Sequence, residues 1–167
     1  KVVFTSLLSS LNNFTRIDRV MSLYSYATLS SIAKRIKSGQ TPRDWVVVDV
    51  RDSDFIGGHI PGCIHIPSIQ FDRSVPDLIQ KIKDVKFVVF HCALSQQRGP
   101  HAAKLYAEKR EEALLKGELK SILPFGIESR ARQESQEIVI LQGGFQAWVN
   151  QFRDDPDLIE GHRPGIW

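Results

Sequence analysis

The chain has 167 residues, 42% of them hydrophobic and 25% charged, a composition typical of one globular domain with a sizeable core. Its net charge of +3 suits an anionic ligand, but the charge is too small and too scattered to indicate nucleic-acid binding. No apolar run approaches the roughly 18 residues of a membrane span, so we expect no membrane partner. Two cysteines do not make a disulfide framework and favour a reducing compartment, the cytoplasm or the nucleus.

Residues 1–20 precede Met21 and are rich in Ser, Thr and Asn, with three basic residues against one acid. This composition is typical of a mitochondrial-type presequence, which would place the protein in mitochondria. Two alternatives stay open. The segment is either sequence ahead of a true start at Met21 and not native, or a poorly ordered arm.

Strands and helices alternate in the first part of the chain. Tyr24–Tyr26 predicts a short strand, and Thr28 predicts the N-cap of a helix that ends at Gly39. The apolar run Trp45–Val50 predicts a buried strand. A turn-rich link then leads to a short strand at Ile64–Ile66.

The alternation continues to the end of the chain. We expect a helix over Val75–Val85 with a proline in its first turn, a strand at Phe87–Phe90 and a helix over His101–Arg110. Ile138–Leu141 predicts the last strand, and the aromatic spacing from Phe145 onward predicts the last helix. This order indicates an α/β fold with a parallel central sheet of about five strands flanked by helices.

Two segments fall outside this alternation. Residues 111–134 are rich in charge and longer than the usual connection of roughly 4–6 residues, so we interpret them as an insertion made of a helix and an exposed loop. The C-terminal tail, residues 153–167, carries two prolines and predicts a loop without an assigned role.

A cysteine and an arginine flank the loop after the strand at Phe87–Phe90. Cys92 lies at the tip of that strand, where backbone amides and the following helix favour an anion and a thiolate. Arg98 lies six positions later and can fold back to grip two oxygens of a tetrahedral anion. The amides of the residues between them can ring that anion. These residues are Ala93, Leu94, Ser95, Gln96 and Gln97.

Three stretches resemble known signatures. HCALSQQRGP, residues 91–100, resembles the active-site loop of the M-phase inducer dual-specificity phosphatases and of the eukaryotic arsenate reductases. DVRDSDFIGGHIPG, residues 49–62, and QGGFQAW, residues 142–148, are similar to the first and last signatures of rhodanese-like domains. The resemblance implies a rhodanese-like three-layer fold for residues 22–152 as the catalytic domain.

The resemblance implies a mechanism. Thiolate Cys92 attacks phosphorus, and water hydrolyses the phosphocysteine. Arg98 and the loop amides neutralise the equatorial oxygens. We expect His91 and Gly99 to support the loop, with the His91 side chain on the side away from Cys92. Ser95 either donates a hydrogen bond to the thiolate or the loop, or is solvated.

The general acid is missing from the loop. M-phase inducer phosphatases carry glutamates there, whereas this chain has Ala93 and Gln97 at those positions. Asp52 or Asp54, in a turn outside the loop, is one hypothesis for a proton donor. The alternative is that both are solvated turn or N-cap carboxylates.

Other residues have structural interpretations. We expect Asp49 and His59, in the first rhodanese signature, to hold the chain together. Cys63 is either a resolving thiol or a small buried filler, and Val50, at the position of the family's second cysteine, favours the filler. Arg51 either contacts substrate or pairs with a carboxylate. No cluster of Cys and His has zinc spacing, so we predict no metal.

Several functions compete. The first is a phosphatase acting on a phosphorylated protein or a small phosphate ester, with no cofactor, as a monomer or weak dimer. The second is an arsenate reductase that uses glutathione or glutaredoxin as reductant. A thiosulfate sulfurtransferase is disfavoured because those enzymes carry a loop one residue shorter. An inactive interaction module, binding through residues 111–134, is disfavoured by the presence of Cys92 and Arg98.

Overall fold

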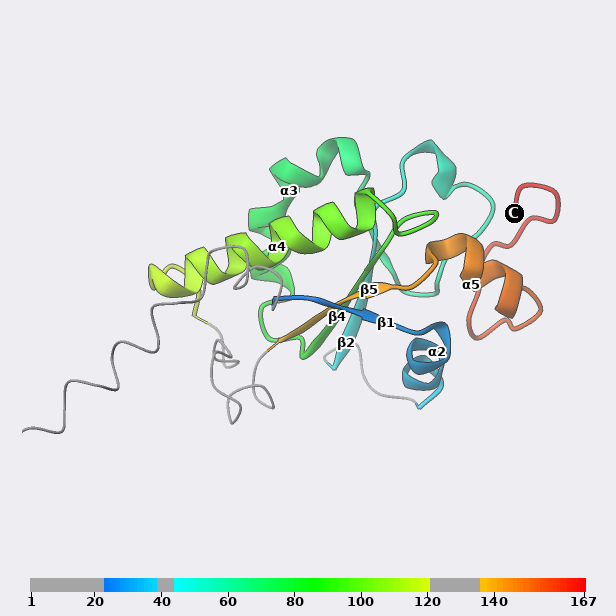
Figure 1. Cartoon of the computed structure of the whole chain (residues 1–167), viewed down its shortest axis with the longest axis horizontal. Helices are drawn as coiled ribbons and strands as arrows, with labels where there is room; N and C mark the ends of the chain where they lie inside the picture. Colours follow the sequence, from blue (N-terminus) through cyan, green and yellow to red (C-terminus); the bar gives the residue numbers. More distant parts are fainter. Residues whose placement is uncertain (1–22, 39–43, 121–135) are drawn as a thin grey trace, which may run out of the picture.

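A computed structural model describes residues 23–38, 44–120 and 136–167. The N-terminal segment 1–20 and residues 121–134 of the predicted insertion lie outside the described residues. The elements follow one another as strands and helices (Figure 1). In chain order they are β1 (Ser25–Ala27), α2 (Leu29–Lys37), β2 (Trp45–Asp49), the short 3-10 helix η1 (Ser53–Phe55), β3 (Ile64–His65), α3 (Ser68–Lys81), β4 (Phe87–His91), α4 (Arg98–Leu115), β5 (Glu137–Leu141) and α5 (Gly144–Phe152).

The described strands form one five-stranded sheet in the order β1-β5-β4-β2-β3, and every pair is parallel. In this register Asp49 of β2 lies beside His91 of β4. Because all strands run the same way, their carboxyl ends meet at one edge, where ligands bind in sheets of this kind. The predicted fold class is therefore confirmed.

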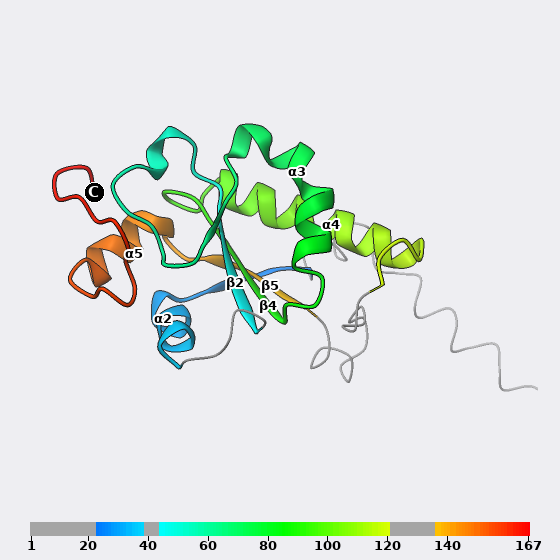
Figure 2. The ribbon, with the colours of Figure 1, turned by 180° about the vertical axis from the view of Figure 1, so that it is seen from behind.

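Helices cover both faces of the sheet (Figures 1 and 2). Helices α3 and α4 pack on one face, around Phe71, Phe90 and Tyr106. Helices α2 and α5 pack on the other face, where Val47 and Trp148 belong to the core. Strands buried on both sides need apolar residues at successive positions, which explains the unbroken valine runs of β2 and β4.

Two helices begin earlier than predicted. Helix α3 spans Ser68–Lys81 with Pro76 inside it, so the predicted helix Val75–Val85 was wrong at both ends. The carboxylate of Asp52 replaces a local cap, since it accepts hydrogen bonds from the Ser68 hydroxyl at 2.7 Å and from the Ile69 amide at 3.3 Å. Helix α4 starts at Arg98, three residues before the predicted His101, which places Arg98 in the first turn.

The flanking segments add to the core. Helix α4 continues through Leu115 into the predicted insertion, and Leu119 beyond it is buried against the α3–α4 layer. In the tail, Leu158 and Ile159 are buried on the α2–α5 side, and the Trp148 indole donates to the Leu158 carbonyl at 2.9 Å. The tail is thus packed on the domain. None of the helices in the described ranges combines the length and apolar character needed to cross a bilayer.

Candidate active site

The sulfur of Cys92 lies at the carboxyl edge of the sheet, directly after β4, and the residue is 3% exposed. Helix α5 holds the start of the loop, because the Phe145 and Gln146 amides donate to the carbonyls of Cys92 and Ala93, each at 2.9 Å. The Ser95 amide donates to the Cys92 sulfur at 3.3 Å. The loop therefore turns carbonyls toward α5 and an amide toward the sulfur.

Two glycines allow helices to approach this loop. Gly144, the first residue of α5, has a φ of +63°, and a Cβ there would overlap the Ala93 carbonyl. Gly99, in the first turn of α4, would place a Cβ 3.4 Å from the Cys92 amide nitrogen. The Cys92 loop is therefore enclosed between the starts of two helices.

Ser95 is not solvated, contrary to one of the two interpretations of the sequence. It is 4% exposed and has a φ of +52°, and its hydroxyl oxygen has no hydrogen-bond partner among the described residues. Its backbone amide, not its hydroxyl, contacts the sulfur. Leu94, Gln96 and Gln97 are exposed, so the outer part of the loop faces solvent.

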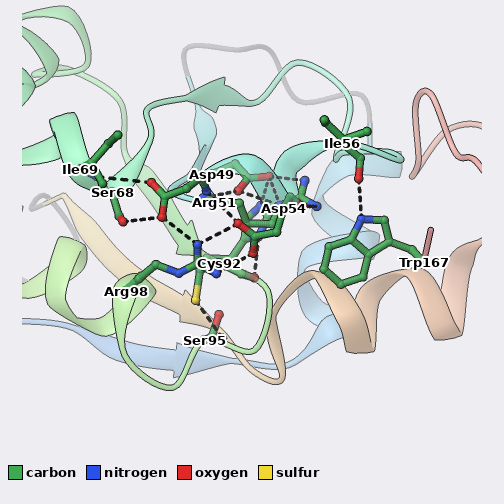
Figure 3. A network of polar contacts seen from close by, with 12 residues as sticks. Asp49, Arg51, Asp54, Ile56, Ser68, Ile69, Cys92, Ser95, Arg98 and Trp167 are labelled. Atoms are coloured by element: carbon green, nitrogen blue, oxygen red, sulfur yellow. Dashed lines mark hydrogen bonds and ion pairs between the residues drawn. The ribbon is translucent and has the colours of Figure 1, made fainter.

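Arg98 is paired with two carboxylates from the turn after β2 (Figure 3). Its Nη1 donates to Asp52 at 2.9 Å and to Asp54 at 2.8 Å, and its Nη2 donates to Asp54 at 2.6 Å. Asp52 and Asp54 are therefore not simply solvated turn carboxylates, although Asp52 does cap α3. The hydrogen bonds from Arg98 lower the pKa of Asp54 to about 2. A carboxyl with that pKa holds no proton to donate near pH 7.

A second arginine lies beneath the turn that carries Asp52 and Asp54. Arg51 is 0% exposed and binds the buried Asp49 carboxylate through Nε at 2.9 Å and Nη2 at 2.6 Å. Its guanidinium lies 3.9 Å from the centre of the Phe145 ring. The interpretation of Arg51 as a substrate contact was wrong, because the side chain is buried and paired with a carboxylate.

His91 lies on the face of the sheet opposite to Cys92. Its ring packs 6.2 Å from the Phe145 ring of the α2–α5 layer, while Cys92 belongs to the α3–α4 core. The His91 Nε2 is 3.5 Å from the Asp49 carboxylate. Burial lowers the pKa of His91, so the ring is neutral near pH 7.

His59 and Cys63 lie away from the sulfur of Cys92. The His59 ring stacks on Phe55, and its Nε2 is 3.4 Å from the Glu160 carboxylate of the tail. Cys63 packs against the α2–α5 core, and burial raises the pKa of its thiol to about 12. A thiol that stays protonated is a poor nucleophile, so the structure favours a packing role for Cys63.

Sequence reasoning missed the contribution of the tail to this region. The Trp167 indole donates to the Ile56 carbonyl at 2.8 Å, and its ring packs edge-on against Phe145 at 5.3 Å. No spacing or motif pointed to this contact, since it joins residues 111 positions apart. In the ranges that the structure describes, no three His, Cys, Asp or Glu side chains gather as metal ligands.

Comparisons with known proteins agree with this geometry. The model of the rhodanese-like domain family matches residues 28–151. Dual specificity phosphatase ibp1 of Schizosaccharomyces pombe is 32% identical over 137 residues, which cover 80% of this chain and 98% of that protein. Arsenate reductase 2.2 of Oryza sativa subsp. japonica is 36% identical over 103 residues, which cover 61% of this chain and 67% of that protein.

A solved structure supports the same relationship. A yeast protein tyrosine phosphatase of the rhodanese family superposes with a TM-score of 0.61 at 28% identity, covering 86% of this chain and 96% of that one. The resemblance seen in the loop, in the turn after β2 and at the start of α5 thus extends over most of the fold. The chain belongs to the rhodanese-like domain family and is related to the Cdc25-like dual-specificity phosphatases and to the Acr2-type arsenate reductases.

Proposed function

We propose that the protein is a cysteine-dependent phosphatase that hydrolyses aryl phosphate esters, such as phosphotyrosine, through a phosphocysteine. The observation that carries this proposal is the hydrogen bond from the Ser95 amide to the Cys92 sulfur, at the edge of the sheet where Arg98 begins the next helix. This amide points at the sulfur that acts as the nucleophile in the proposed mechanism.

The reaction proceeds in two displacements. The Cys92 sulfur attacks phosphorus, the bond from phosphorus to the ester oxygen breaks, and the alcohol or phenol leaves. Water then attacks the phosphocysteine, and the bond between sulfur and phosphorus breaks to release inorganic phosphate and the thiolate. Arg98 and the loop amides stabilise the charge on the oxygens that do not react.

The carboxylates near the loop restrict the substrate class. Asp52 and Asp54 bind Arg98, and the pKa of Asp54 is lowered to about 2, so neither is placed to protonate a leaving oxygen. A phenolate leaves without full protonation far more readily than an alkoxide does. We therefore expect aryl phosphates to be hydrolysed faster than phosphoserine or phosphothreonine.

Arsenate reduction is the second candidate, because the same loop would serve both anions, and the packing of Cys63 restricts where the second thiol comes from. In this reaction the Cys92 thiol forms a sulfur–arsenic bond with loss of water, and a glutathione thiol then attacks the Cys92 sulfur. The electron pair of the sulfur–arsenic bond passes to arsenic, which leaves as arsenite, and a mixed disulfide remains for glutaredoxin to reduce. Because Cys63 packs on the other layer with a pKa of about 12, the second thiol must come from outside.

Three parallel assays test these functions. The purified protein is given an aryl phosphate, arsenate with glutathione and glutaredoxin, or thiosulfate with cyanide, with Cys92→Ser as the inactive control and Cys63→Ser as the matched control. We expect turnover of the aryl phosphate that is lost in Cys92→Ser and kept in Cys63→Ser. Arsenate reduction without phosphate release would replace the first function by the second, and dominant thiocyanate formation would contradict both.

A further inference from the structure

We infer that Asp52 and Asp54 are positioning residues that orient the guanidinium of Arg98, so that its Nε–Nη2 edge is presented to an oxyanion at Cys92. The inference deepens the proposed function and rests on it only for the identity of the substrate.

A guanidinium has five N–H donors in a fixed plane. Asp54 accepts in parallel from Nη1 and Nη2, at 2.8 and 2.6 Å, and therefore occupies the inner hydrogen of each nitrogen. Asp52 accepts from Nη1 at 2.9 Å and occupies its outer hydrogen. The donors that remain are Nε–H and the outer hydrogen of Nη2, and Nε has no partner in the described ranges.

The two remaining donors lie on one edge of the guanidinium. That edge has the spacing of the two-pronged grip that arginine uses on carboxylates and phosphates. In Figure 3 the Cys92 sulfur and the Asp54 carboxylate lie on opposite sides of the Arg98 guanidinium. The carboxylates thus bind the far end of the guanidinium and leave the edge that faces the sulfur.

The turn that carries both carboxylates is held in place by hydrogen bonds from a buried side chain. The buried Arg51 donates through Nη1 to the Asp54 carbonyl at 3.2 Å and through Nη2 to the Gly58 carbonyl at 2.9 Å. It therefore holds the turn at two points along its length.

The C-terminal tail binds the same turn through two more hydrogen bonds. The Trp167 indole donates to the Ile56 carbonyl at 2.8 Å, and the Arg163 amide donates to the Gly57 carbonyl at 3.1 Å. A Cβ at Gly57 would lie 2.6 Å from the Ile166 side chain, which shows how closely the tail covers the turn. Trp167 is therefore a further, more remote positioning residue for Arg98.

The alternative is that the carboxylates compete with the anion for Arg98. Two negative charges beside one guanidinium repel an oxyanion, so removal of Asp54 would by charge alone tighten anion binding. Orientation has the opposite effect, because a released arginine side chain must lose rotamer entropy when the anion binds. The sign of the change on removing Asp54 therefore separates the two roles.

The experiment measures tungstate binding by calorimetry in the Cys92→Ser protein, so that no turnover is required. We expect Asp54→Ala to weaken tungstate binding about tenfold. The freed Arg98 side chain would then lose most of its rotamer entropy on binding the anion, instead of losing it when the protein folds. Asp54→Asn, which keeps one acceptor oxygen, should weaken it less, and Trp167→Ala should weaken it by about threefold. Circular dichroism and thermal unfolding show that each variant is folded, and the asparagine variant carries the test if the alanine variant is not.

A matched background separates positioning from general damage to the fold. In Arg98→Lys the two-pronged edge is absent, so Asp54→Ala should change tungstate binding there by less than about twofold. Unchanged or tighter binding in Asp54→Ala, or an equal loss in both backgrounds, would overturn the inference. A normal tungstate pattern without aryl phosphate turnover would reject the proposed function and keep the inference.

Discussion

Arg51 and Arg98 lie on either side of the same turn and carry the same guanidinium, yet their surroundings differ. Arg51 is fully buried and binds the Asp49 carboxylate through its Nε–Nη2 edge, and two carbonyls and three aromatic rings surround the rest. The side chain of Arg98 is 32% exposed and binds Asp54 through its Nη1–Nη2 end, which leaves the Nε–Nη2 edge available.

The comparison shows how an arginine can be assigned to structure or to chemistry. A buried guanidinium whose two-pronged edge is already bound holds the fold together. A partly exposed guanidinium that is bound to carboxylates at its Nη1–Nη2 end is held in place, and its Nε–Nη2 edge can still bind an anion. The edge of the guanidinium that stays available to an anion is therefore a better guide to the role of an arginine than the number of arginines near a site.

The largest expected effect is on stability, when Arg51 is replaced. Arg51→Met removes the partner of the buried Asp49, and an unpaired buried carboxylate costs about 3–5 kcal/mol of the free energy of unfolding. Urea denaturation measures this loss. The double variant with Asp49→Asn should recover part of it, and a single variant as stable as the parent would contradict the structural role of Arg51.

The next effect is on activity, when Arg98 is replaced. Arg98→Lys keeps a charge but not the two-pronged grip, so kcat/KM for an aryl phosphate should fall by about 100-fold or more. Because partly exposed ion pairs contribute about 0.2–1 kcal/mol each, the free energy of unfolding should change little. Near-normal turnover would remove Arg98 from the proposed mechanism.

A smaller effect comes from moving the loop while both arginines stay in place. Gly144→Ala forces a Cβ against the Ala93 carbonyl at a φ of +63°, so the loop must shift or α5 must retreat. Strain of this kind costs about 1–3 kcal/mol. We expect reduced thermal stability together with reduced kcat, whereas Gly62→Ala, at an open site with a similar φ, should reduce stability alone.

The smallest effect is the pH dependence of stability that comes from the partly exposed ion pair of Asp54 and Arg98. The pKa of Asp54 is lowered from an ordinary value near 3.8 to about 2, so the folded protein binds a proton at Asp54 less readily than the unfolded chain does. Its stabilisation is therefore complete above about pH 4 and is lost as the pH falls toward 2. The difference in Tm between the parent and Asp54→Asn should shrink over that range, and a constant difference would contradict the pairing with Arg98.

Local patterns predicted the features that depend on neighbouring residues. The apolar run Phe87–Phe90 predicted β4. Thr28 was predicted to cap α2, and its hydroxyl accepts a hydrogen bond from the Ser31 amide at 3.3 Å. The alternation of elements predicted the parallel sheet. The position of Cys92 at a strand end followed from the same reasoning, whereas Arg98 was expected in the loop before the helix and lies in the first turn of α4.

Contacts between distant residues were not accessible in this way. Arg98 lies 46 and 44 positions from Asp52 and Asp54, and no local spacing encodes which carboxylate an arginine will reach. The early start of α3 has the same cause, because its cap comes from Asp52, 16 positions before Ser68. A single sequence carries no signal for pairs of this kind.

Because α5 binds the Cys92 and Ala93 carbonyls and α4 begins at Arg98, the loop between Ala93 and Arg98 is attached at both ends to separate helices. Deletion or insertion of one residue between these attachments would change the length of the loop, and the sheet and the helices would stay in place. If the loop binds an oxyanion as we propose, a change of one residue in its length would suit an anion of a different radius. Catalytic diversity in a fold built this way needs little change outside a segment four residues long.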